Sequence, residues 1–281
     1  MTIVYNLEKT MTGAQILNKI GISLLQKDCY RQALATFQEA ISVIDNDHDR
    51  DFDVETLIDQ ANARLEAPEP FPRKVVIKHA SLSVKDVSEG DNVEAVLEAL
   101  QGDASDEGSL TLQFDTNIPR RIALNLALAI IQYNNAVAYS AFAKGLSRQR
   151  RIDAAGVKRQ LALNLLKMSD GELTHFTQVP MEADILRKVF FVHMVVLLGL
   201  HKHEVGSSRE SMVIDKLYHL HAHLSNNLDA LAAMEETDIK KETIRKESMA
   251  KGARLHSLFR TATSKRNLDC SCHSNDTWLS Y

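Results

Sequence analysis

Cysteine is scarce in this chain of 281 residues, where it occurs only as Cys29, Cys270 and Cys272. An odd number of cysteines, two of them crowded together, does not predict a disulfide framework and fits a reducing compartment. A secretory signal is also missing, because Lys9 and Lys19 interrupt the apolar residues of the first twenty positions. We therefore expect a cytoplasmic protein without disulfide bonds.

The chain also lacks an excess of either charge, since its formal net charge is −4. This balance argues against a protein that wraps nucleic acid along its whole length, so nucleic acid is not an expected partner. The sequence contains no glycine-rich phosphate loop, nucleophile elbow, catalytic histidine motif or dinucleotide fingerprint. We therefore predict no catalytic residues and no cofactor, and we expect that the protein is not an enzyme.

One long run without charge, residues 122–143, approaches the length that crosses a bilayer. It contains side-chain amides, which are costly in lipid because they find no water there: Asn125, Gln132, Asn134 and Asn135. We predict that this run is a helix buried in the middle of a helical bundle and does not span a membrane.

Apolar residues recur with a helical period over most of the chain, and 44% of all residues are hydrophobic. The first period covers Ile16 to Leu25, and a second follows Lys27 and Asp28 and continues to Ile44. A short third helix over 54–65 is predicted to begin from Asp53 as its N-cap. Further helices are expected near 120–145, 152–169, 181–202, 209–235 and 239–259.

Composition divides the chain into four parts. Residues 1–66 hold the first helical hairpin and the short helix, and residues 67–119 hold a proline-rich linker and an acidic insertion. Residues 120–236 hold two further helical hairpins, and residues 237–281 a basic helix and a frayed tail.

The acidic insertion interrupts the helices. Pro68, Pro70 and Pro72 stop helix formation, because proline lacks an amide donor and restricts the residue before it. Val75–Ile77 and Leu110–Phe114 are predicted to be short extended segments. Residues 84–108 between them are acidic and rich in glycine and serine, so we predict a partly disordered loop anchored by its two apolar ends.

The clearest motif lies between residues 17 and 40, at the spacing L-x2-I-G-x2-L…A-x3-F-x2-A. It is formed by Leu17, Ile20, Gly21, Leu24, Ala33, Phe37 and Ala40. The segment resembles one tetratricopeptide unit, a pair of antiparallel helices in which small residues let the backbones approach closely. A degenerate second unit resembles it through Asn134, Ala136, Tyr139, Ala162, Leu166 and Ser169. A third hairpin, from Asp184 to Asn227, agrees only in length and order.

The resemblance implies an all-α fold of stacked antiparallel hairpins, an irregular right-handed solenoid. It also implies a scaffold or adaptor that binds a peptide or protein on the concave face made by the first helix of each pair. The positions that match this face are Gln15, Asn18, Ile22, Tyr133, Asn134 and Val137. The lysine with which some members grip chaperone tails is missing, which disfavours that ligand. The Asn134 amide can donate to and accept from an extended peptide backbone, or it can instead hydrogen-bond a neighbouring helix as an internal tie.

Two alternatives remain open from the residues alone. The first is a cryptic metal-dependent enzyme built on the histidines between residues 201 and 223, which are His201, His203, His219, His221 and His223, beside Glu204. His219 and His223 share a helix face and have the spacing of a zinc-binding pair, but no glutamate follows His219 as in zinc proteases. The C-x-C-H sequence of Cys270, Cys272 and His273 lacks a second ligand pair, and we predict no metal at either place.

The second alternative is a helical domain that binds an acidic polymer. Basic residues gather near the second hairpin loop, namely Lys144, Arg148, Arg150, Arg151, Lys158 and Arg159. A second group lies towards the end of the chain: Lys240, Lys241, Arg245, Lys246, Lys251, Arg254, Arg260, Lys265 and Arg266. Either group can meet phosphates or an acidic partner, although aromatic residues that stack on bases are scarce among them.

Overall fold

The computed structural model describes residues 2–46, 53–71, 79–83, 109–113, 120–178, 183–204 and 206–220. The chain divides into two units, residues 1–218 and residues 219–281, and nearly all described residues belong to the first. Several predictions lie outside the described residues: the extended segment 75–77, the acidic run 84–108, the helix over 239–259, the second basic group and the C-terminal cysteines.

The first hairpin consists of α1 (Thr2–Gln26) and α2 (Tyr30–Asp45). Between them the chain reverses through Asp28, which has a φ of 59°. The two helices approach each other closely at Gly21, where an added Cβ would lie 2.6 Å from Cε1 of Phe37. This contact confirms the close helix approach that the spacing of the motif predicts.

The third helix, α3, covers Val54–Glu66 and begins as predicted at Asp53. The Asp53 carboxylate accepts a hydrogen bond from the backbone N–H of Thr56 at 3.1 Å. This bond satisfies one of the backbone donors that the first turn of a helix leaves without a partner.

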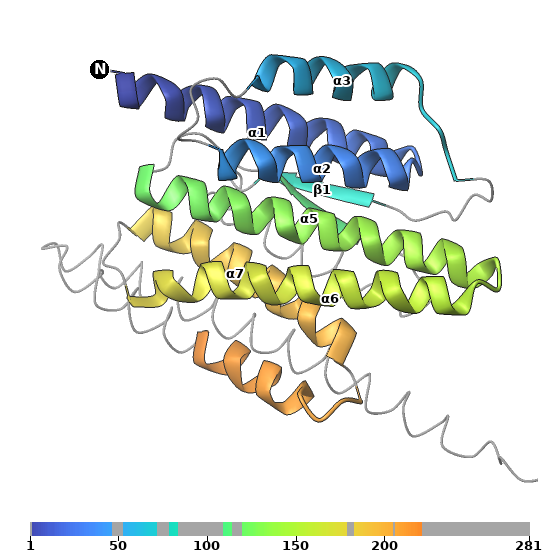
Figure 1. Cartoon of the computed structure of the whole chain (residues 1–281). Helices are drawn as coiled ribbons and strands as arrows, with labels where there is room; N and C mark the ends of the chain where they lie inside the picture. The colour runs from blue at the N-terminus through green and yellow to red at the C-terminus, as the bar shows by residue number, and fades with distance from the viewer. Residues whose placement is uncertain are drawn as a thin grey trace, which may run out of the picture. The chain divides into compact units, whose positions relative to one another are not determined.

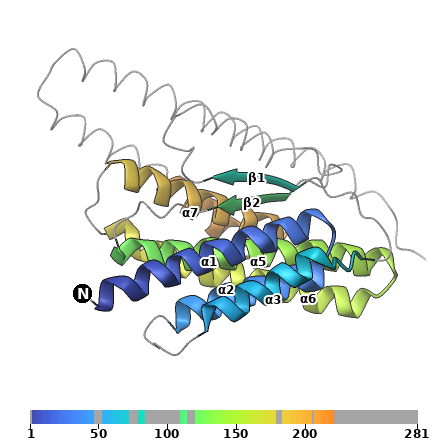
Figure 2. The same ribbon diagram turned by 90° about the horizontal axis from the view of Figure 1, so that it is seen from above.

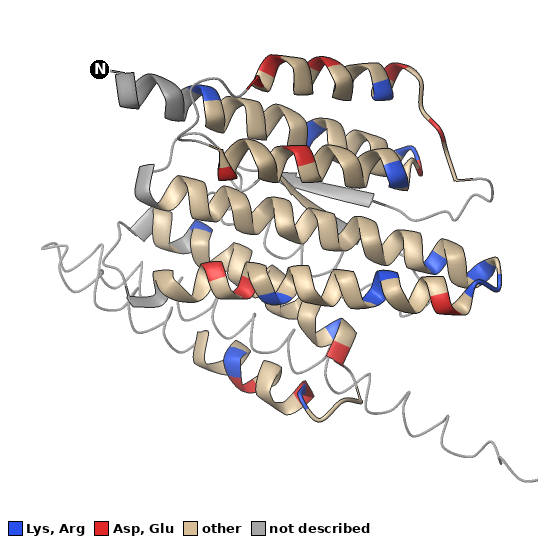
Figure 3. Cartoon of the chain, viewed as in Figure 1, with Lys and Arg blue, Asp and Glu red and all other residues tan. Residues whose placement is uncertain are grey.

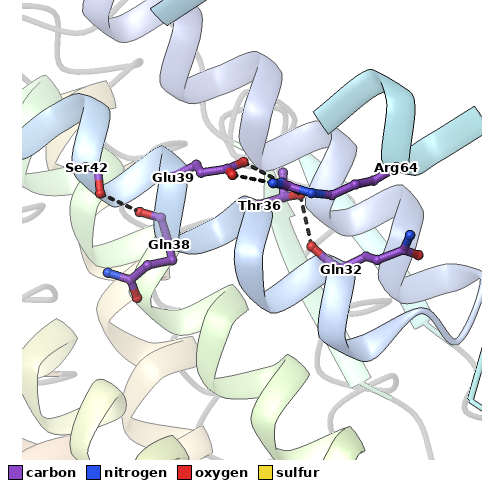
Figure 4. Close-up of polar contacts among 6 residues, drawn as sticks. All are labelled: Gln32, Thr36, Gln38, Glu39, Ser42 and Arg64. Atoms are coloured by element: carbon purple, nitrogen blue, oxygen red, sulfur yellow. Dashed lines mark hydrogen bonds and ion pairs between the residues drawn. The ribbon is translucent and has the colours of Figure 1, made fainter. Parts of the chain in front are cut away.

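Polar side chains of α2 fix both α3 and the chain that follows it. The two Nη atoms of Arg64 each donate to one carboxylate oxygen of Glu39 at 2.6 Å (Figure 4). Gln32 donates to the carbonyl of Ala67 at 3.1 Å and accepts from the N–H of Glu69 at 2.8 Å. The start of the proline-rich linker therefore lies along α2.

Phe71 anchors the end of this linker. Its ring centroid lies 5.8 Å from that of Tyr30 and 5.6 Å from that of Phe142. An added Cβ at Gly145 would lie 2.9 Å from the Phe71 ring, so the absence of a side chain at Gly145 makes room for it. The Phe71 N–H also donates to the carbonyl of Asp28 at 3.0 Å. Phe71 thereby joins α2 to the helix that carries Phe142.

That helix is α5 (Arg120–Arg148), and it is followed by α6 (Ile152–Thr174), a short 3-10 helix at His175–Gln178, and α7 (Ala183–Glu204). Residues 210–220 are helical as well. The expected helices near 120–145, 152–169 and 181–202 are therefore present, with ends shifted by a few residues. Most of α5 is buried, as predicted for the run without charge. No helix in the described part of the chain is long and apolar enough to cross a membrane.

Helices make up most of the described residues, which confirms the predicted all-α class. The helices pack mostly as antiparallel neighbours. α5 contacts both helices of the first hairpin, α6 lies against α5, and α7 lies against α6 (Figure 1). α3 covers α1 and α2.

A small sheet accompanies the helices. Strand β1 (His79–Ser83) pairs in parallel with β2 (Ser109–Gln113), with His79 opposite Ser109 and Ser83 opposite Gln113. β2 confirms the extended segment predicted at 110–114, apart from Phe114, which lies outside the described residues. The pairing itself was not predicted. Both strands lie along the face that α1 and α5 share (Figure 2).

Candidate functional site

Two asparagines from different hairpins meet beneath this sheet. Asn18 lies on α1 and Asn134 on α5, and both side chains are fully buried. Nδ2 of Asn134 donates to Oδ1 of Asn18 at 2.8 Å. We refer to these two residues as the asparagine pair. It combines two of the residues that the sequence assigns to the binding face.

The asparagine pair holds the main chain of β2 at Leu112. The Leu112 N–H donates to Oδ1 of Asn134 at 2.8 Å. The Leu112 carbonyl accepts from Nδ2 of Asn134 at 2.7 Å and from Nδ2 of Asn18 at 3.0 Å. Each N–H of the Asn134 amide therefore has its own acceptor, one on Asn18 and one on Leu112.

This arrangement closes one edge of β2. The N–H and C=O groups of one strand residue point towards the same edge, and both groups of Leu112 go to Asn134. The side-chain amide thus occupies the place of a neighbouring strand, at a position where an unpaired edge would otherwise be buried. The hydrogen bonds from the asparagine pair to β2 therefore go to backbone groups of Leu112.

The other residues predicted for the binding face differ in burial. Ile22 and Tyr133 are buried, and Gln15 and Val137 are half-buried. Tyr133 faces α7, because an added Cβ at Gly199 would lie 3.4 Å from its ring. Burial raises the pKa of the Tyr133 hydroxyl. The structure therefore brings together Asn18 and Asn134 at the strand, and it places Tyr133 in the packing between helices.

The histidines that the sequence offers as an alternative site make contacts with different residues, His203 with Ser140 and His201 with Glu210. His203 Nε2 lies 3.0 Å from Ser140 Oγ, whose own hydroxyl donates to the carbonyl of Ala136 at 2.9 Å. The direction of the bond between Ser140 and His203 depends on the tautomer of the histidine. Burial lowers the pKa of His203, and the positive charges of Arg159 and Lys144 lower it further.

His201 belongs to a different contact, with Nε2 lying 3.3 Å from Oε1 of Glu210. His219 is helical and exposed, whereas His221 and His223 lie outside the described residues. The predicted pairing of His219 with His223 on one helix face is therefore not tested by the structure. Within the described ranges, no group of three or more histidine, cysteine, aspartate or glutamate side chains is placed to hold a metal ion.

A polar cluster that the sequence did not reveal links three helices. Asp170 on α6 is buried, and its Oδ1 lies 2.9 Å from Nε2 of His193 on α7. Lys216, in the helix at 210–220, donates to the other carboxylate oxygen. Burial alone would raise the pKa of Asp170, but the hydrogen bonds and charges of His193 and Lys216 outweigh burial and lower it below its usual value of 3.8.

We expect the Asp170 cluster to make the protein sensitive to acid. A carboxyl whose pKa is lower in the folded than in the unfolded chain stabilises the fold above its unfolded pKa, and this stabilisation is lost as the pH falls through the folded pKa. Urea unfolding of Asp170→Asn should therefore show a deficit relative to wild type at neutral pH that shrinks below about pH 4. Asp59→Asn, on the exposed surface of α3, is the control. A deficit that is the same at every pH would contradict this assignment.

Comparison with known proteins adds no family to this description: no family model matches the chain, and neither does any curated protein or solved structure.

Proposed function

We propose that the chain is a non-catalytic scaffold that binds a peptide or protein partner through its helical hairpins. The observation that carries this proposal is the asparagine pair, which hydrogen-bonds the main chain of an extended segment. The hairpins are proposed to be degenerate tetratricopeptide-like units in an irregular right-handed solenoid. The contact between Gly21 and Phe37 and the packing of α5 on the first hairpin support this proposal.

The binding face is occupied in this structure by a segment of the same chain, β2. A partner peptide that uses the asparagine pair must therefore compete with Leu112, whose side chain is fully buried. A tethered competitor acts at an effective concentration of up to about a millimolar, which weakens the apparent affinity of any peptide added from solution. The proposal thus predicts weak binding to the wild-type chain and tighter binding once β2 is released.

A peptide of residues 107–117, EGSLTLQFDTN, tests this with fluorescence anisotropy on the full chain. In Leu112→Pro the strand loses the N–H that Asn134 accepts and the leucine side chain that fills the core. The labelled peptide should bind this variant at least about tenfold more tightly than it binds wild type.

The matched control is the same peptide with an N-methyl group on the amide of its central leucine, the counterpart of Leu112. It keeps every side chain but cannot donate to Asn134, so it should bind far more weakly. Circular dichroism shows whether Leu112→Pro keeps its helices. If the variant loses them, the unmodified and N-methylated peptides are compared on wild type instead, at high peptide concentration. Equal binding of the two peptides would show that the asparagine pair does not recognise a partner's main chain.

A further inference from the structure

The outer face of α6 exposes large apolar side chains. Among the described residues, most of the large hydrophobic side chains with substantial exposure belong to this helix: Ile152, Val157, Leu161 and Met168. Val157 is 60% exposed and Met168 is 55% exposed. Val157, Leu161 and Met168 are spaced by four and seven residues, so they lie along one side of the helix. An apolar stripe of this kind on a surface helix marks an interaction site.

Basic residues gather at the turn between α5 and α6, where this stripe starts (Figure 3). Arg150, Arg151 and Arg159 are exposed, and none of them, nor Lys158, forms an ion pair with a carboxylate of the described residues. The Lys158 ammonium lies 5.2 Å from the ring centroid of Tyr139, and Arg159 donates to Ser147 at 2.8 Å. Contacts to neutral groups thus hold Lys158 and Arg159 in place, and within the described ranges no carboxylate pairs with either cation.

We propose that this surface, which we call the α6 face, docks an amphipathic acidic helix of a partner protein. The α6 face consists of Val157, Leu161 and Met168 together with Arg150, Arg151 and Lys158. A helix with leucine-type residues on one side and carboxylates on the other complements both parts, because its apolar side covers the stripe and its carboxylates meet the unpaired cations. This contact does not depend on the asparagine pair, since α6 lies on the other side of α5 from the strands (Figure 2).

Chemistry favours an acidic helix over nucleic acid or a lipid surface. Phosphate backbones would use the cations but would leave the apolar stripe uncovered, and Tyr139 and Phe142 are already covered by Lys158. A lipid surface is opposed by the lack of tryptophan or phenylalanine along the stripe.

The probe is a helical peptide of about five turns, with leucine on one face and glutamate on the other, titrated into the full chain. A second peptide with the same residues in an order that scatters the leucines is its control. The double variants Arg151→Glu with Lys158→Glu, and Val157→Ser with Leu161→Ser, should each raise the Kd of the first peptide by about tenfold. The effect of the charge variant should shrink when the salt concentration is raised from about 0.05 to about 0.5 M.

Lys19→Glu on α1 and Met212→Ser in the helix at 210–220 change exposed residues elsewhere and should leave the Kd unchanged. Equal affinity for the two peptides, or equal Kd values for all variants, would overturn the proposal. Binding to vesicles of phosphatidylcholine and phosphatidylserine without binding to the peptide would overturn the choice of partner. Thermal melts verify that each variant is folded. If the amphipathic peptide fails to bind the α6 face, the result of the test of the asparagine pair is unaffected, because that test measures binding of the 107–117 peptide at Asn18 and Asn134.

Discussion

Replacing Asn134 by leucine is expected to lower the free energy of unfolding by about 2 to 4 kcal/mol, because two buried polar groups lose their partners. These groups are the N–H of Leu112 and Oδ1 of Asn18, which bond to Asn134 at 2.8 Å each. The carbonyl of Leu112 keeps its bond from Asn18, so it contributes little to the loss. Urea unfolding monitored by circular dichroism measures the difference.

Asn125→Leu is the matched control, since it makes the same substitution on the same helix. Asn125 is half-buried and forms no side-chain hydrogen bond among the described residues, so the change should alter stability by less than about 0.5 kcal/mol. If Asn134→Leu proves as mild as Asn125→Leu, then the asparagine pair does not hold β2 in solution.

Gly21→Leu is expected to destabilise the first hairpin by about 1 to 3 kcal/mol through overpacking. Three ring carbons of Phe37 lie between 2.6 and 2.9 Å from the position of an added Cβ, and Phe37 is fully buried. A side chain at position 21 of α1 can therefore be accommodated only if α1 and α2 move apart. The melting temperature of the variant should fall accordingly.

Gly156→Leu provides a control of opposite sign. Gly156 also lies within a helix, but nothing stands within 4 Å of an added Cβ there. The change should raise stability by up to about 1 kcal/mol, because glycine in a helix costs conformational entropy that leucine does not. Equal effects at the two positions would show that helix propensity, and not the contact with Phe37, sets the result.

The sequence was sufficient to locate the helices and some of their contacts. The period of the apolar residues gave α1, α2, α5, α6 and α7 to within a few residues, except for the first turns of α1. The cap at Asp53 and the close approach at Gly21 followed from local rules, since both depend on residues within one hairpin or one turn. The extended nature of residues 110–113 was also visible, because strand-forming residues cluster there.

The partners of these elements were not visible in the sequence. An alternating pattern indicates a strand but not what it pairs with, so neither the parallel sheet nor the bonds from Asn134 to Leu112 could be derived. The cluster around Asp170 was missed for a similar reason. His193 lies 23 positions and Lys216 lies 46 positions from Asp170, and no local spacing relates them. The asparagines were chosen by resemblance, and the structure adds the segment that they hold.

The place of Asn18 and Asn134 in the chain bears on the order in which the protein folds. The two residues are 116 positions apart, whereas the helices of each hairpin are joined by a few residues. Closing a long loop costs more chain entropy than closing a short one, so hairpins form before contacts between distant hairpins. The bond between the two asparagines and the bond from Asn18 to Leu112 can form only after both hairpins have met, whereas the two bonds from Asn134 to Leu112 span only 22 positions and do not need the first hairpin.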